Sequence, residues 1–290
     1  MAIATVAHST LSSLVSQLDG ALPIAGLYSP NRSQLKDSKL PHFNDLGSML
    51  SATKPRLCTF LSPYPTLRED VLCCLQNGID VIAAGPIPHL NLETTNQALA
   101  QTEARLAIGG IHHTSSLFNT ALKQRNQDSF ATPVYLRLLA GVQGPGLQPA
   151  WWAACQQWAM ATDLLEEKPE QLHLCSNRQG RAYHLTLTAR APSGALIQIT
   201  IAPQRYLSEM TFLGRGGLIA ASSSQSGIVL TNNQGTQVVH DTLPPAELEW
   251  LGNFYEHRDP PSESSCDFST ALLRGIRQAL KQNQPILVTL

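Results

Sequence analysis

Hydrophobic and polar positions follow two different periods in the first third of the chain. Residues 57–61 form a short apolar run, and breaker residues follow at 62–65. Apolar residues then recur at helical spacing until Asn77-Gly78, and residues 79–83 form a second short apolar run. A strand, a helix of about ten residues and a second strand make a βαβ unit, which implies two parallel strands joined by a right-handed crossover.

Segments of the same kind lie on both sides of this unit. Their alternation along the chain predicts an open parallel sheet with helices on its faces. The other elements expected in this half are strands at 3–7, 22–28 and 106–111 and helices at 11–18, 46–51 and 93–104.

The pattern changes in the second half. Short alternating runs separated by Gly, Pro, Ser and Asn predict an antiparallel meander at 183–191, 195–202, 207–213, 217–222, 228–231 and 236–240. Around it, helices are expected at 117–124, 151–165, 246–257 and 267–282, and strands at 134–140 and 286–289. We therefore expect an α/β domain over 1–110 and an α+β domain with a large open antiparallel sheet over 111–290.

Composition excludes several classes of protein. The chain has 290 residues, of which 43% are hydrophobic and 14% charged, with a net charge of -1 and no basic run, so a disordered or nucleic-acid-binding protein is not expected. No segment approaches the roughly 18 apolar residues of a membrane span. The first apolar stretch is too short for a secretory signal, so we expect a cytoplasmic protein. The six cysteines show no CxxC spacing, which predicts free thiols and no metal site.

Four segments, in order along the chain, carry a resemblance to a known family. They are residues 42–88, Trp158–Leu165, the strand pair 191–202 and 210–222, and the closing helix and strand 268–288. Together they resemble the Gfo/Idh/MocA family (glucose–fructose oxidoreductase, inositol dehydrogenase and relatives) over nearly the whole chain. The resemblance implies a Rossmann-like dinucleotide-binding domain, here a trimmed and degenerate one, followed by the family's α+β domain.

The resemblance places a cofactor site at the ends of the first strands, but its main feature is missing. The family has a glycine-rich turn after the first strand, where only glycine lets the backbone approach the pyrophosphate. Here that turn is Ala7–Thr10, without glycine. The positions of this vestigial site are His8, Ser9, Thr10, Ser29, Ser62 and Pro63, of which Ser29 is a partial match to the NADP pattern. We expect no cofactor, and NADP or NAD if there is one.

The family's catalytic residues are also replaced. Its Glu-Lys-Pro motif corresponds to Ala84-Gly85-Pro86, so the lysine is replaced by Gly85. Its catalytic histidine corresponds to Met160, whereas the aspartate three residues later remains as Asp163. General acid–base catalysis needs a titratable group near the substrate, and neither glycine nor methionine provides one.

Other residues have two readings each. His112 and His113 occupy positions where the family lines its cleft, so together with Asp163 they are the remaining catalytic candidates; wall or capping histidines are the alternative. Trp151 and Trp158 share a helical face, which fits either core packing or a ligand or partner surface. The glycines of residues 214–217 fit a hairpin turn better than a phosphate loop, because no helix follows.

Three functional hypotheses follow. The first is a pseudoenzyme that serves as a binding or scaffolding subunit, with a homo-oligomer or hetero-partner covering the apolar face expected on the C-terminal sheet. The second is an NAD(P)H-dependent oxidoreductase of the biliverdin-reductase type, acting on a small organic substrate. The third is a sensor that binds a small molecule in the former cleft. No nucleic-acid or membrane partner is expected.

Overall fold

The structure is a computed structural model, which describes residues 2–4, 24–28, 40–60, 64, 66–87, 89–109, 112, 116–142, 146–204, 208–222, 227–239 and 263–290. The chain separates into two compact units. We call Met1–Gly110 with Glu247–Cys266 the N-terminal unit, and Ile111–Ala246 with Asp267–Leu290 the C-terminal unit. Each is described by itself below.

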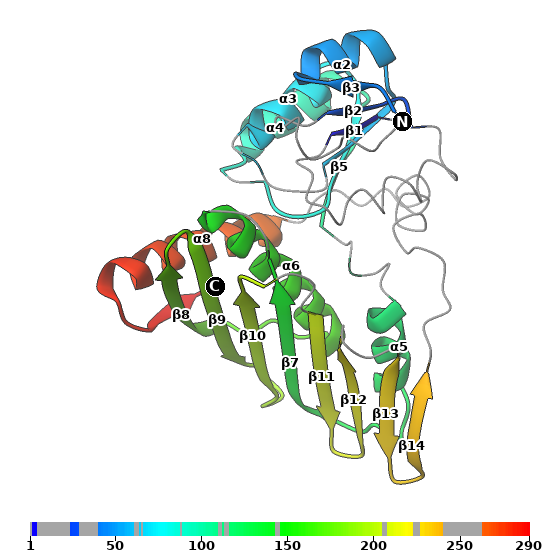
Figure 1. The fold of residues 1–290 in the computed structure, drawn as a ribbon, viewed down its shortest axis with the longest axis vertical. Helices are drawn as coiled ribbons and strands as arrows, with labels where there is room; N and C mark the ends of the chain where they lie inside the picture. Colours follow the sequence, from blue (N-terminus) through cyan, green and yellow to red (C-terminus); the bar gives the residue numbers. More distant parts are fainter. Residues whose placement is uncertain are drawn as a thin grey trace. The chain divides into compact units, whose positions relative to one another are not determined.

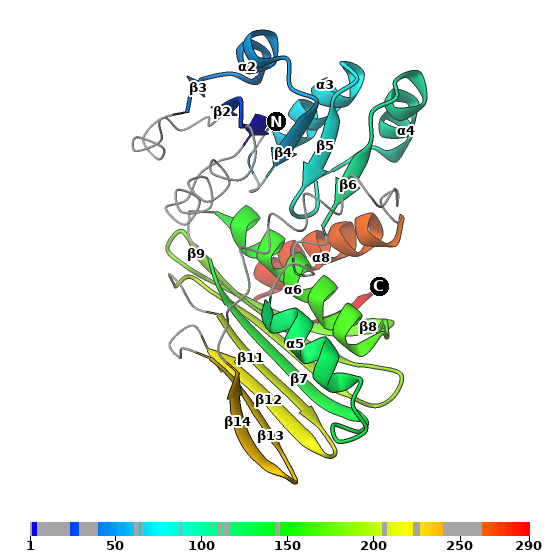
Figure 2. The same cartoon turned by 90° about the vertical axis from the view of Figure 1, so that its right-hand side faces the viewer.

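The N-terminal unit contains a parallel sheet with the strand order β3-β2-β1-β4-β5-β6 (Figures 1 and 2). Three described helices share one buried hydrophobic cluster with strands of this sheet. The strands are β1 (Ala2–Ala4), β2 (Gly26–Tyr28), β3 (His42–Phe43), β4 (Leu57–Phe60), β5 (Asp80–Ala83) and β6 (Leu106–Ile108). The helices are α2 (Leu46–Thr53), α3 (Leu67–Gln76) and α4 (Leu92–Gln101).

Local signals set the ends of these helices. The Asp45 carboxylate accepts a hydrogen bond from the Ser48 backbone N–H at 2.8 Å, and the Asn91 side chain caps α4 by accepting from the Thr94 N–H at 3.2 Å. Gly78, with a φ of 69°, follows α3 in the left-handed conformation that glycine adopts without strain. The breaker at Asn77-Gly78 therefore ends the helix where the sequence predicts.

The C-terminal unit is built on a nine-stranded sheet with the order β14-β13-β12-β11-β7-β10-β9-β8-β15. All its pairs are antiparallel except β7 with β10. The strands are β7 (Pro133–Gly141), β8 (Gln171–Gln179), β9 (Ala182–Arg190), β10 (Leu196–Ala202), β11 (Ser208–Gly214), β12 (Gly217–Ser222), β13 (Ile228–Asn232), β14 (Gly235–Val239) and β15 (Ile286–Thr289). The helices α5 (Ser116–Arg125), α6 (Leu147–Leu165) and α8 (Glu263–Gln282) lie on one face of it (Figure 2).

This architecture confirms the predicted fold class and adds two strands that the pattern did not predict. Strand β3 has only two residues, and β8 has just two apolar residues in its core-facing row, Leu172 and Leu174, before it becomes polar. The parallel pairing of β7 with β10 is also new, because hydrophobic period does not determine which strands become neighbours. The helices expected at 11–18 and 246–257 lie outside the described residues.

The hairpin between β11 and β12 explains the glycines of residues 214–217. The turn formed by residues 126–130 lies against this hairpin, and the Gly216 N–H donates to the Phe130 carbonyl at 3.1 Å. A Cβ added at Gly214 would lie 2.2 Å from the Phe130 carbonyl oxygen, and one at Gly216 would lie 2.4 Å from the Ser129 carbonyl oxygen. The hairpin interpretation is therefore confirmed, and the glycines are required by close backbone approach.

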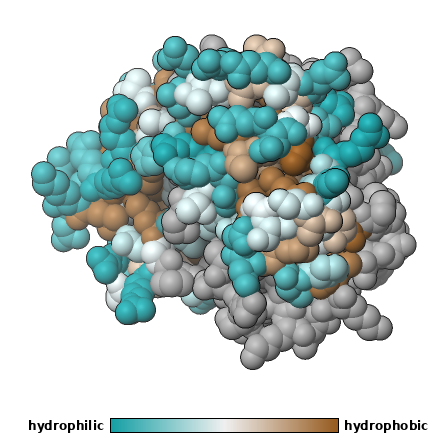
Figure 3. Space-filling model, turned by 90° about the horizontal axis from the view of Figure 1, so that it is seen from above, coloured by the Kyte–Doolittle hydropathy of each residue, from teal (hydrophilic) through white to brown (hydrophobic). Residues whose placement is uncertain are grey.

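The described surface is mostly polar in the view from above. Hydrophilic residues cover most of it, and hydrophobic residues are visible between them (Figure 3). Among the described residues, no helix is long and apolar enough to cross a membrane.

Candidate functional site

The candidate site residues divide into two groups. His112 and Asp163 are described, and both belong to the C-terminal unit. The other candidates from the sequence lie outside the described residues: His8, Ser9, Thr10, Ser29, Ser62, Pro63 and His113.

The structure brings His112 and Asp163 together although they are 51 positions apart in sequence. The Nε2 atom of His112 lies 2.6 Å from Oδ2 of Asp163. Asp163 is on the last turn of α6, and His112 lies between β6 and α5. A distance this short is typical of a charge-assisted hydrogen bond. The pair therefore joins His112 to the C-terminal end of α6.

The two members of the pair differ in exposure. The His112 side chain is 8% exposed, and its ring meets the buried ring of Phe118 edge to face at a centroid distance of 5.0 Å. The Asp163 side chain is 41% exposed. A molecule approaching from solvent therefore meets the carboxylate first, and the imidazole serves from behind as the partner that orients it.

The positions that correspond to the family's lysine and histidine are buried. Ala84 and Gly85 follow β5 directly and are both buried. Met160 lies on α6 one turn before Asp163, and it too is buried. Neither Gly85 nor Met160 can exchange a proton, so of these corresponding positions only Asp163 carries a titratable side chain.

The tryptophans of α6 are part of the core. Trp151 is almost completely buried, and its indole N–H donates to the Ser269 carbonyl at 2.9 Å. Trp158 stacks on Phe268 with a centroid distance of 4.8 Å and an interplanar angle of 9°. Both contacts attach α8 to α6, so the core reading of these residues is the one that the structure supports.

A second cluster, which sequence reasoning missed, lies at the carboxyl ends of the strands in the N-terminal unit. Tyr28 is the last residue of β2, and Tyr64 follows β4; their rings meet edge to face at 6.1 Å. Asp70, in the first turn of α3, accepts from the Thr66 hydroxyl at 3.2 Å, and it lies close enough to both tyrosines for its charge to raise their pKa. Tyr64 and Asp70 are only six positions apart, but Tyr28 is distant in sequence, and nothing in the pattern links it to them.

Burial controls the acid–base behaviour of this cluster. It raises the pKa of Asp70, although the hydroxyl groups that donate to the carboxylate act in the opposite direction. Burial also raises the pKa of the Tyr64 and Tyr28 hydroxyls, and the nearby Asp70 charge adds to the effect. Both phenols are therefore neutral donors over the whole physiological range.

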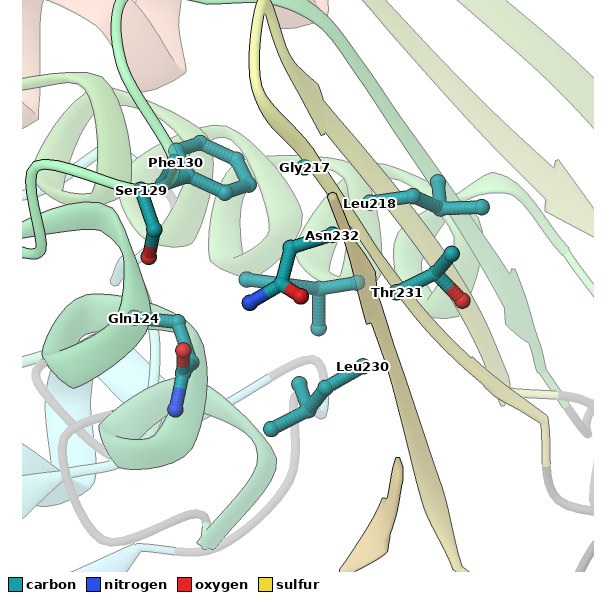
Figure 4. Close-up of a pocket in the computed structure, with 9 residues that line it drawn as sticks. Gln124, Ser129, Phe130, Gly217, Leu218, Leu230, Thr231 and Asn232 are labelled. Carbon is teal, nitrogen blue, oxygen red and sulfur yellow. The ribbon is translucent and has the colours of Figure 1, made fainter. Parts of the chain in front are cut away.

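The remaining candidates for a functional site are metal-binding clusters, cysteines and a surface pocket, and each has less support than the two clusters above. Within the described part of the chain, no three His, Cys, Asp or Glu side chains are placed to hold a metal ion. Cys58, Cys73, Cys74, Cys155 and Cys175 are free thiols, and burial raises the pKa of Cys73 and Cys155. A shallow pocket lies between the end of α5 and strands β12 and β13, where Gln124, Ser129 and Asn232 surround an opening beside Phe130 (Figure 4). Its described lining carries no charged side chain.

Comparison with known proteins identifies solved structures that share this fold. No protein-family model and no curated protein sequence match this chain. Solved structures do match along its full length. The aldose-aldose oxidoreductase from Caulobacter crescentus, in complex with glycerol, has a TM-score of 0.75 at 13% identity, and the match covers 100% of this chain and 98% of the other.

Two further structures agree. UDP-N-acetylglucosamine 3-dehydrogenase from Acidithiobacillus ferrooxidans has a TM-score of 0.71 at 12% identity, with 97% of each chain covered. A dehydrogenase from Chromobacterium violaceum has a TM-score of 0.72 at 14% identity, with 98% of this chain and 96% of the other covered. The chain therefore has the full-length fold of the Gfo/Idh/MocA-type oxidoreductases and dehydrogenases.

Proposed function

We propose that this protein is a non-catalytic member of its fold that works as a binding or scaffolding subunit. One observation carries the proposal: the positions that correspond to the family's lysine and histidine hold Gly85 and Met160, and both are buried. Loss of one group is compatible with a changed reaction. Loss of both removes proton transfer from the inherited positions.

The described residues also do not fit a nicotinamide dinucleotide. In an open parallel sheet, ligands bind outside the carboxyl ends of the strands at the point where the strand order reverses. In this sheet, Tyr28, Tyr64 and Asp70 pack together at those ends. We therefore propose that the protein works without NAD or NADP.

Support for a binding role comes from the face of the nine-stranded sheet that the described helices leave open. Leu196, Tyr135, Leu213 and Leu218 are register neighbours across β10, β7, β11 and β12. Leu196 is 42% exposed and Leu213 is 38% exposed. The residues beside this row are more polar than the apolar face that the sequence pattern predicts. For example, the Tyr135 hydroxyl donates a hydrogen bond to the Gln198 side chain at 2.7 Å. We propose that this row contacts a second copy or another protein.

Substitution within the row tests the contact. Leu196→Glu and Leu213→Glu place charges in the proposed interface, and Leu287→Glu is the control, because Leu287 is also an exposed leucine, 53% exposed, but lies on β15 at the edge of the sheet. We expect the wild type and the control to elute as the same assembly in size-exclusion chromatography with light scattering. The two row variants should shift to a smaller species. Identical masses for all four proteins contradict this part of the proposal.

A thermal-shift titration with NADH and NADPH tests the non-catalytic assignment. A ligand at 100 times its dissociation constant stabilises a native protein by about 2.7 kcal/mol, which is easily visible in the melting temperature. We expect no shift with either nucleotide up to millimolar concentration. A clear shift with either one contradicts the assignment.

One observation favours a second candidate, an NAD(P)H-dependent oxidoreductase that acts on a small organic substrate. The 2.6 Å contact places an imidazole beside the surviving carboxylate Asp163, and such a pair can hold and release a proton. In that case His112→Asn lowers kcat and leaves nucleotide binding unchanged. Without a thermal shift from either nucleotide in the wild type, this candidate is abandoned.

A further inference from the structure

The strand order of the N-terminal unit defines one position where a ligand of this fold is expected. The sheet runs outward from β1 to β2 and β3 on one side and to β4, β5 and β6 on the other. The order therefore reverses between β1 and β4. The space outside the carboxyl ends of these strands is where open parallel sheets bind their ligands.

Aromatic side chains from both sides of β1 meet at this position. Ala4, the last residue of β1, is in register with Tyr28 at the end of β2 and with Phe60 at the end of β4. Tyr64 contacts both aromatic residues, with centroid distances of 6.1 Å to Tyr28 and 6.4 Å to Phe60. The rings of β2 and β4 are thus joined through Tyr64 across the strand that separates them.

These rings are closed off from solvent. Tyr28 is 6% exposed, Tyr64 is 3% exposed and Phe60 is completely buried. All three belong to the hydrophobic cluster that the sheet shares with α2, α3 and α4. A planar base that entered at the reversal point on this face of the sheet would have to displace at least one of them.

A carboxylate lies beside the two tyrosines. Asp70 accepts a hydrogen bond from the Thr66 hydroxyl at 3.2 Å, and its charge raises the pKa of both phenols, so both stay neutral. The packing of the rings is what resists a ligand, because displacing a buried ring exposes its apolar surface to water and breaks its aromatic contacts.

We infer that the packed rings of Tyr28 and Tyr64 close the adenine-nucleoside subsite of this fold, and that Tyr64 is the residue that excludes an adenine base. The inference rests on the proposed function, because it names the residues that prevent dinucleotide binding in the N-terminal unit.

A set of Tyr64 variants of the full chain tests the inference, with adenosine as the probe because it needs no phosphate site. Tyr64→Ala removes the ring, whereas Tyr64→Phe keeps the ring and removes only the hydroxyl. Leu75→Ala is the matched control for an ordinary cavity, because Leu75 is fully buried in the same cluster. If Tyr64→Ala does not fold, Tyr64→Leu opens a smaller space with less loss of apolar contact.

The expected result is a gain of binding by one variant. Adenosine at ten times its dissociation constant should raise the melting temperature of Tyr64→Ala by about 2 to 4 °C. Wild type, Tyr64→Phe and Leu75→Ala should not respond. In isothermal titration calorimetry, the affinity of Tyr64→Ala for adenosine should exceed that of the wild type at least about tenfold.

Three results overturn the inference. They are an absence of any response in both Tyr64→Ala and Tyr64→Leu, an equal response in Leu75→Ala, and binding of adenosine by the wild type. The same plate carries wild type with NADPH, which separates the two claims. If the wild type ignores NADPH and the Tyr64 variants ignore adenosine, the closure fails while the non-catalytic assignment stands.

Discussion

The two units of the molecule fix their geometry in different ways. In the N-terminal unit no described strand exceeds four residues, and aromatic rings pack together at the ends of β2 and β4. In the C-terminal unit strands reach nine residues, and close contacts between backbones depend on glycine, as at Gly214 and Gly216.

This difference separates the residues that the fold requires for packing from the positions that the family uses for catalysis. The C-terminal unit requires specific residues for packing, and the sequence still has them. In the N-terminal unit, where the resemblance places cofactor chemistry, the rings of Tyr28, Phe60 and Tyr64 pack against each other at the ends of the strands. Both sets of contacts are therefore explained by packing. Neither set involves the positions that correspond to the family's catalytic lysine and histidine.

The largest expected effect is on the glycine contacts of the C-terminal unit. Gly214→Ala places a methyl group 2.2 Å from the Phe130 carbonyl oxygen, so the hairpin or the turn beside it must move. We expect a loss of at least about 3 kcal/mol in the free energy of unfolding, measured by chemical denaturation.

Gly47→Ala is the control for this comparison. Gly47 is an exposed residue of α2 in the N-terminal unit, and an added Cβ would meet only the Asp45 side chain at 3.4 Å. This substitution should stabilise the protein by about 0.5 to 1 kcal/mol. Equal effects at the two glycines would remove the proposed difference between the units.

The next effect concerns the pair of His112 and Asp163. In a double-mutant cycle with His112→Ala and Asp163→Ala, we expect a coupling energy of about 1 to 3 kcal/mol, because the hydrogen bond is short and one partner is buried. Chemical denaturation of the four proteins gives the value. A coupling below about 0.5 kcal/mol would mean that the contact does not hold α6.

A smaller effect separates two neighbouring tryptophans. Trp151→Phe removes the 2.9 Å hydrogen bond to the Ser269 carbonyl and shrinks a buried ring. Trp152→Phe is the matched substitution, because it shrinks a buried ring in the same way but the Trp152 N–H has no acceptor among the described residues. Trp151→Phe should therefore lower the free energy of unfolding by about 1 kcal/mol more than Trp152→Phe does. Thermal denaturation of both variants checks the contrast.

The smallest effect is a pH dependence in the N-terminal unit. The pKa of Asp70 is raised above its ordinary 3.8 by burial, so the folded protein binds this proton more tightly than the unfolded chain. The stabilisation is complete below about pH 4 and is lost as the pH rises through the folded pKa. The stability of wild type relative to Asp70→Asn should therefore fall as the pH is raised from about 4 to 7. A constant difference in urea denaturation, or one that rises with pH, contradicts this.

Much of the fold could be predicted from the sequence, because period and breaker residues are local signals. Helix α3 with its Asn77-Gly78 end is such a case. Strand β8 was missed because Leu172 and Leu174 are too few to show a period. The parallel pairing of β7 with β10 depends on which strands become neighbours, and that choice is made by contacts distant in sequence.

The candidate site shows the same difference between local sequence signals and contacts that depend on tertiary structure. His112 and Asp163 were candidates as single residues, but their contact depends on tertiary structure and has no sequence signal. The tyrosine cluster was missed entirely, because Tyr28 comes from a segment distant in sequence from Tyr64 and Asp70, and all three are ordinary residues where they stand. Single-residue chemistry can be read from a sequence, whereas the space that side chains fill together cannot.

The most direct test of the central claim is equilibrium dialysis of the full-length protein against NADPH and, separately, NADH. The account predicts equal nucleotide concentrations on both sides of the membrane at millimolar nucleotide and high protein concentration. Retention of about one nucleotide per chain would contradict it, because the N-terminal unit would then hold the cofactor that Tyr64 is inferred to exclude.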